Sequence, residues 1–170
     1  TTALGPVCVA TSVTELRGWD AEVIDENNYQ RYGPRTDDGR PDHGALQRLR
    51  PAEIVGFYGG LTSTIPRLYE LTRAYKQMGV VTIAGGQHFV EENLREALDN
   101  GIDYVVMGEG EETIQEFLTT LASGGDVGSG KGLAYLRNGA VHCTPPRPPL
   151  TAFDHLPLPR FSLVRYARIK

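Results

Sequence analysis

Three short loops hold most of the residues that could bind a ligand. Residues 59–64 join two glycines to three hydroxyl side chains, residues 85–88 read Gly-Gly-Gln-His, and residues 108–111 read Gly-Glu-Gly-Glu. Glycines let a ligand approach the backbone closely. Hydroxyls hydrogen-bond to carbonyls, ring nitrogens or phosphate, and a helix N-terminus favours an anion. The residue types therefore indicate ligand binding at these loops.

Each loop also has a purely structural interpretation, which the sequence leaves open. Thr64 is expected to cap the helix that follows, and the paired glycines before Gln87 would make a tight turn. His88 would then be an ordinary hydrogen-bonding loop residue, and Glu111 would complement the helix dipole. Glu109 precedes that helix and is expected to face the ligand edge. The candidate cofactor-binding residues are Thr62, Ser63, Thr64, Gly85, Gly86, Gln87, His88, Gly108, Glu109, Gly110 and Glu111.

No catalytic or metal-ligating set is predicted. The four histidines lie far apart in the chain, and no nucleophile–base constellation is visible. The spacing of Cys8 and Cys143 fits neither a zinc site nor an iron–sulfur ligand run. Neither the Gly-Lys-Ser/Thr signature of a phosphate-binding loop nor a G-x-G-x-x-G dinucleotide fingerprint occurs.

Composition narrows the class of protein. The 170 residues carry a net charge of −4 with scattered Lys and Arg, which argues against a nucleic-acid partner. No stretch approaches the roughly 20 apolar residues that cross a membrane. Two cysteines favour a reduced, cytoplasmic setting. Because the chain opens on Thr1 and not on Met, it is expected to be a fragment.

Short apolar runs alternate with amphipathic ones, which predicts a parallel sheet covered by helices on both faces. In such a sheet the three loops share the carboxyl edge, where ligands bind. Asn138-Gly139 predicts a type I′ hairpin, and the Pro-rich segment after it reads as an extended linker or docking arm. Helices are expected over 4–16, 43–49, 65–78, 91–98 and from 112, and strands over 21–24, 53–58, 80–84 and 103–107.

These runs resemble the amino-terminal, cobalamin-binding domain of the cobalamin-dependent radical S-adenosylmethionine enzymes. The resemblance covers nearly the whole chain and is specific in combination. The matching pieces are 4–5, 18–20, 23–25, 54–58, 62–64, 84–89, 101–113, 131–135, 138–139 and 153–159.

The resemblance implies a flavodoxin-like (Rossmann-like) three-layer α/β domain with a mostly parallel sheet, plus a carboxyl-terminal β-hairpin and Pro-rich arm. It implies a corrin ring over the carboxyl edge, with its dimethylbenzimidazole tail reaching toward 62–64 and 85–86, and 108–111 bordering it. It divides the chain into a cobalamin domain at 1–130 without the family's first strand, a hairpin at 131–144 and a linker at 145–170.

Two absences shape the functional hypothesis. The D-x-H-x-x-G motif, whose His binds cobalt in other methyltransferases, does not occur, so base-off binding without a protein histidine is expected. No C-x-x-x-C-x-x-C run occurs either, which places S-adenosylmethionine and the iron–sulfur cluster in a partner domain after Lys170. The isolated chain is then expected to be inactive.

The leading hypothesis is thus a cobalamin carrier for methyl transfer or a related radical step. Two alternatives remain. One is a docking domain of the same enzyme class that no longer binds cobalamin, and the other is a stand-alone binder of another flat cofactor such as a flavin.

Overall fold

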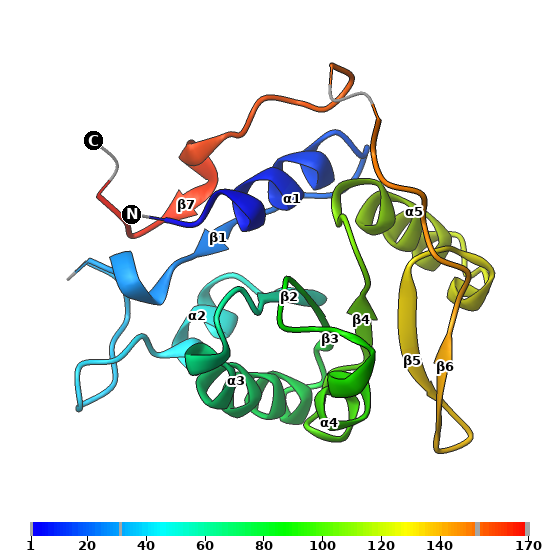
Figure 1. The fold of residues 1–170 in the computed structure, drawn as a ribbon. Coiled ribbons are helices and arrows are strands. Elements are labelled where there is room, and N and C mark those ends of the chain that lie inside the picture. Colours follow the sequence, from blue (N-terminus) through cyan, green and yellow to red (C-terminus); the bar gives the residue numbers. More distant parts are fainter. Residues whose placement is uncertain (1, 31, 152–153, 169–170) are drawn as a thin grey trace. The chain divides into compact units, whose positions relative to one another are not determined.

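Two units make up the chain in the computed structural model, which describes residues 2–30, 32–151 and 154–168 (Figure 1). One unit comprises Thr1–Ala52 with Asp154–Lys170, and the other comprises Glu53–Phe153. All three candidate loops belong to the second unit. Phe153, which carried part of the resemblance, lies outside the described residues, as do Thr1 and Lys170.

The second unit is built on a five-stranded sheet. Its strands are β2 (Ile54–Tyr58), β3 (Val81–Gly85), β4 (Tyr104–Val106), β5 (Leu133–Arg137) and β6 (Ala140–Cys143), in that spatial order. β2, β3 and β4 run parallel, as predicted. The hairpin β5–β6 continues the sheet in antiparallel fashion through β4. Its turn residues Asn138 and Gly139 have φ of 53° and 77°, which fits the predicted type I′ turn.

Helices lie on both faces of this sheet. Ala84 and Val105 pack in one cluster with α3 (Ile65–Gln77) and α4 (Leu94–Asp99). Tyr104 precedes Val105 and so faces the opposite side, where its ring lies 4.9 Å from that of Phe117 on α5 (Glu111–Ala122). The helix–sheet–helix arrangement confirms the predicted α/β class, although half of the sheet pairings are antiparallel.

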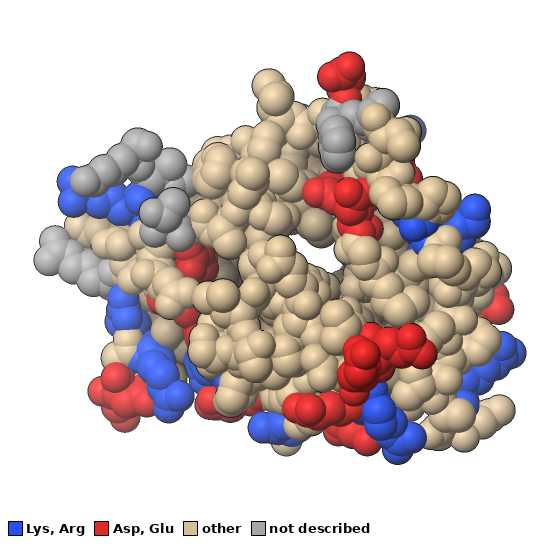
Figure 2. Space-filling model, in the orientation of Figure 1, with Lys and Arg blue, Asp and Glu red and all other residues tan. Residues whose placement is uncertain are grey.

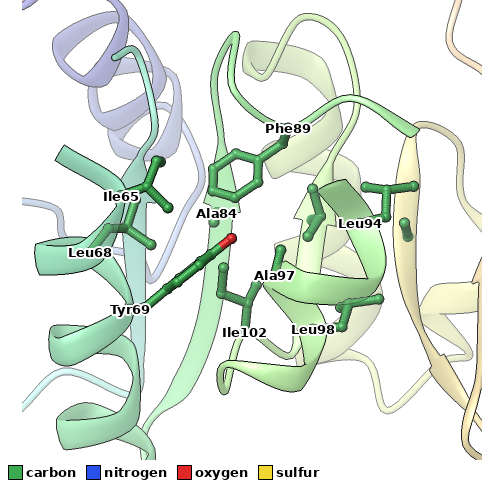
Figure 3. Close-up of a cluster of buried hydrophobic side chains, with 11 residues drawn as sticks. Ile65, Leu68, Tyr69, Ala84, Phe89, Leu94, Ala97, Leu98 and Ile102 are labelled. Atoms are coloured by element: carbon green, nitrogen blue, oxygen red, sulfur yellow. The ribbon is translucent and has the colours of Figure 1, made fainter. Parts of the chain in front are cut away.

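The core under α3 and α4 is apolar and closely packed. Figure 3 shows side chains from α3, the loop after β3 and α4 converging on β3. Burial raises the pKa of the Tyr69 hydroxyl in this cluster, with Glu96 adding to the effect. Burial likewise raises the pKa of Tyr104, with smaller effects from Asp103, Tyr135 and Asp126. Both phenols are therefore neutral at physiological pH.

The first unit pairs the two ends of the chain. β1 (Val23–Ile24) lies parallel to β7 (Val164–Arg165), beside α1 (Leu4–Thr14). The unit also contains α2 (His43–Leu49). The sequence placed 145–170 in a linker outside the core, whereas the structure buries Val164 in this unit. Short 3-10 helices occupy Glu26–Asn28, Thr62–Thr64, Glu91–Asn93, Val127–Ser129 and Phe161–Leu163.

Within the described residues, no helix has the length and apolar character needed to cross a bilayer. Basic and acidic side chains are interspersed on the face in view in Figure 2. Cys8 and Cys143 form no disulfide.

The contact between α5 and the sheet gives a first prediction. Phe117 is 2% exposed, so Phe117→Ala is expected to lower the free energy of unfolding by about 3–5 kcal/mol through lost burial and a cavity. Leu121→Ala on the same helix is the matched control, because Leu121 is 36% exposed and loses less. Urea denaturation measures both, and equal losses would contradict the assigned packing of α5.

Candidate functional site

The loops after β2 and β3 are bonded to each other through their backbones. Gly59 N–H donates to Gly85 O at 2.8 Å, and His88 N–H donates to Gly59 O at 2.9 Å. The loop after β4 starts at the same edge, because β4 runs parallel to β3. The structure therefore brings the three predicted loops together at the carboxyl edge of β2, β3 and β4.

Glycine is required where the first two loops touch. Gly86 has φ of +118°, and a Cβ there would lie 2.8 Å from Gly59 O. A Cβ on Gly59 would lie 2.6 Å from Cε2 of Phe89, whose ring points into the buried cluster (Figure 3). The sequence predicted glycines whose backbone a ligand could approach, and at these two positions the protein itself fills the space where a side chain would lie. The missing side chains are replaced by backbone and by the Phe89 ring.

Space is left on the sheet face opposite α3 and α4, in a strip that we call the glycine strip (Gly56, Tyr58 and Gly85). Gly56 is exposed, Tyr58 is 44% exposed, and Gly85 lies beside Tyr58 in register. A Cβ on Gly85 would make only an ordinary contact, 3.4 Å from Val106 Cβ. The Tyr58 ring rests on Gly60, where a Cβ would lie 2.5 Å from ring carbon Cε1. The strip combines bare backbone with one held aromatic ring.

The polar residues of the first two loops divide into exposed and inward-facing groups. Thr62, Ser63 and Gln87 are exposed at the edge. The Thr64 hydroxyl donates to Leu61 O at 2.7 Å, so the predicted side-chain cap is wrong, because the helix is entered through a 3-10 turn. His88 packs edge-on against Phe89 with ring centroids 5.4 Å apart, and its buried Nε2 has no hydrogen-bond partner in the described part of the chain.

The third loop is held by the Pro-rich segment. Gly108 has φ of +83° and open space around its Cα. The Glu109 carboxylate accepts a hydrogen bond from Leu150 N–H at 2.7 Å, and Glu109 O accepts one from Thr113 Oγ1 at 3.2 Å. Glu109 is exposed, but one of its carboxylate oxygens is turned to the backbone of residue 150. Glu111 lies in the first turn of α5.

Some residues of this edge were not found from the sequence. Gly56 and Tyr58 were assigned only to a buried strand, although their alternation placed them on one face. Arg147 and Leu150 lay in a segment that reads as a linker, and nothing in its composition signals the contacts that it makes. Across the described ranges, no group of three or more His, Cys, Asp or Glu side chains could hold a metal ion.

This fold agrees with what comparison with known proteins shows. Residues 1–118 match the family of the B12 binding domain, and the chain belongs to that family. An "uncharacterized methyltransferase" of Pyrococcus horikoshii is 33% identical in an alignment of 119 residues, which covers 65% of this chain and 26% of that protein.

Solved structures show the same fold. Two structures of TsrM from Kitasatospora setae, a radical S-adenosylmethionine methyltransferase, superpose with TM-scores of 0.68 and 0.67 at 22% and 20% identity. They cover 88% and 95% of this chain, and 28% and 29% of TsrM. The first holds tryptophan and an S-adenosylmethionine analogue, and the second holds cobalamin and a [4Fe-4S] cluster. The chain thus spans less than a third of the proteins that it matches.

The contact between Gly86 and Gly59 gives a second prediction. Gly86→Ala and Gly108→Ala both place a side chain at positive φ, which costs about 1–3 kcal/mol in each variant. Only Gly86→Ala adds a collision with backbone, for which overpacking costs about 1–3 kcal/mol more. Thermal unfolding should therefore show a clearly larger loss for Gly86→Ala. A loss no larger than that of Gly108→Ala would mean that the loops can separate freely.

Proposed function

We propose that this chain binds cobalamin at the carboxyl edge of β2, β3 and β4, and that it serves as the cofactor domain of a radical S-adenosylmethionine methyltransferase. The observation that carries the proposal is the glycine strip beside three converging loops, in a chain that belongs to the B12 binding domain family. The related methyltransferase and the TsrM structures support the enzyme class.

The residues at the edge fit such a ligand. A large flat ring needs bare backbone and apolar surface, which Gly85 and the exposed ring of Tyr58 present on one face. The amide groups around a corrin need hydrogen-bond partners, which the exposed side chains of Thr62, Ser63 and Gln87 supply. Gly108, which follows β4, has open space where a side chain would lie. None of these residues is charged, so they do not select for a charged ligand.

The role of this chain's residues is to bind and orient. Cobalamin supplies a cobalt centre that holds a methyl group for transfer. The buried Nε2 of His88 supports binding without a histidine of this chain on the cobalt, because that nitrogen is not presented at the surface. S-adenosylmethionine and the iron–sulfur cluster are assigned in this proposal to a further domain of the enzyme.

A direct test follows titration of the chain with hydroxocobalamin by visible absorption. We expect a saturable spectral change and pigment that is retained through desalting. Absence of both would favour a docking domain that does not bind cobalamin. Copurification of a yellow flavin would instead favour a different flat cofactor.

The glycine strip gives a third prediction, for the series Gly85→Ala, Gly85→Val and Gly85→Leu. Gly85 has no positive φ, and a Cβ there would make an ordinary contact with Val106, so a small side chain is added with little strain. Cobalamin affinity should fall with side-chain size, by about tenfold or more for Leu, since a tenfold change needs only about 1.4 kcal/mol of lost contact.

Unfolding measured on the same variants is the control for this series. A graded loss of affinity at nearly constant stability would support binding over the strip. An affinity that does not change across the three variants would remove the strip from the site, even if the chain binds cobalamin elsewhere.

A further inference from the structure

The Pro-rich segment at residues 145–150, called here the proline arm, is anchored along its length. Four of its six residues are prolines, so only Arg147 and Leu150 carry a backbone N–H. Pro145 O accepts from Gly132 N–H at 2.9 Å, and Leu150 N–H donates to the Glu109 carboxylate at 2.7 Å. A segment of this composition is stiff and extended. Fixing both ends therefore fixes the whole arm.

Arg147 anchors the middle of the arm on α5. Its Nε donates to Thr113 Oγ1 at 3.0 Å, one terminal nitrogen lies 3.5 Å from a Glu112 oxygen, and the other pairs with Glu116. The Arg147 side chain is only 16% exposed. Partial burial and several acceptors at once distinguish this contact from a weak surface ion pair.

Arg147 is connected to the loop at the cofactor edge. Thr113 is 1% exposed, and its hydroxyl accepts from Arg147 and donates to Glu109 O. Glu109 is then held twice, at its carbonyl through Thr113 and at its carboxylate by Leu150. Gly132, with φ of +73°, lets the arm lie close, because a Cβ there would be 3.2 Å from Thr113 Oγ1.

The edge loop has few other restraints. Gly108 has open space around it, and Gly110 lies on the far side of Glu109. Glycines on both sides give the loop many conformations when it is not held. A ligand that binds only one of these loop conformations binds more tightly when the loop is already held in it.

We propose that Arg147 is a positioning residue for the cofactor edge, and that docking of the proline arm is coupled to ligand binding at residues 108–111. This rests on the proposed binding of cobalamin. Because linkage is reciprocal, docking of the arm strengthens cobalamin binding by the same factor as cobalamin strengthens docking of the arm. The contacts of the arm are therefore expected to be more stable when cobalamin is bound at the edge.

The test compares Arg147→Ala with Arg95→Ala in the full chain. Arg95 is a matched control, because it pairs with Asp99 at 2.7 Å and donates to Gly139 O at 3.0 Å, away from the arm. Hydroxocobalamin affinity should fall about three- to tenfold in Arg147→Ala and stay unchanged in Arg95→Ala. Leu150→Pro removes one arm donor while suiting an extended segment, and should weaken binding in the same direction.

Amide exchange at Leu150 separates positioning from simple stabilisation. Hydroxocobalamin should slow exchange of this amide several-fold in the unmodified chain, and not in Arg147→Ala. Two results would overturn the coupling: cobalamin binds while Leu150 exchange stays the same, or Arg147→Ala binds as tightly as the unmodified chain. If the unmodified chain does not bind cobalamin at all, the proposed function fails first and the coupling fails with it.

Discussion

The constraint on which this edge depends is the direct contact of two backbones, at Gly86 and Gly59. Two neighbouring parallel strands end within hydrogen-bonding distance of each other's loops. The backbone of Gly59 leaves no volume for a Cβ on Gly86, and the Phe89 ring leaves none for a Cβ on Gly59. The glycines there are explained by packing inside the protein. Bonded loops of this kind form a firm rim, and firm scaffolds are what hold binding residues in place.

The rim determines where a ligand has room. Since Phe89 fills the space beside Gly59 on the α3 side, the accessible backbone lies on the opposite face, at Gly85 and Gly56. Tyr58 lies two residues after Gly56 in β2 and is paired with Gly85 in β3, and it remains 44% exposed. A large exposed aromatic ring at the ligand edge of a parallel sheet is informative, whereas single exposed apolar residues elsewhere are ordinary.

Periodicity predicted the elements of the second unit well, and it predicted that the three loops share one edge of the sheet. It did so because buried strands and amphipathic helices leave strong local patterns, and because parallel strands place their following loops together. The sequence could not assign individual glycines. Gly85 and Gly86 are adjacent and identical in type, yet a Cβ would fit at Gly85 and would collide with the backbone of Gly59 at Gly86.

Long-range contacts of polar segments were hidden for a related reason. A proline-rich segment has no periodic apolar face, so its composition is typical of a linker. The partners of the Arg147 side chain lie more than thirty positions away in the sequence. The same holds for β7, whose two residues pair with a strand near the other end of the chain. Where local pattern is weak, a few specific hydrogen bonds decide whether a segment is free or docked. In this chain such a segment holds the third loop of the candidate site, so the part of the sequence that looks least structured contributes to the order of that loop.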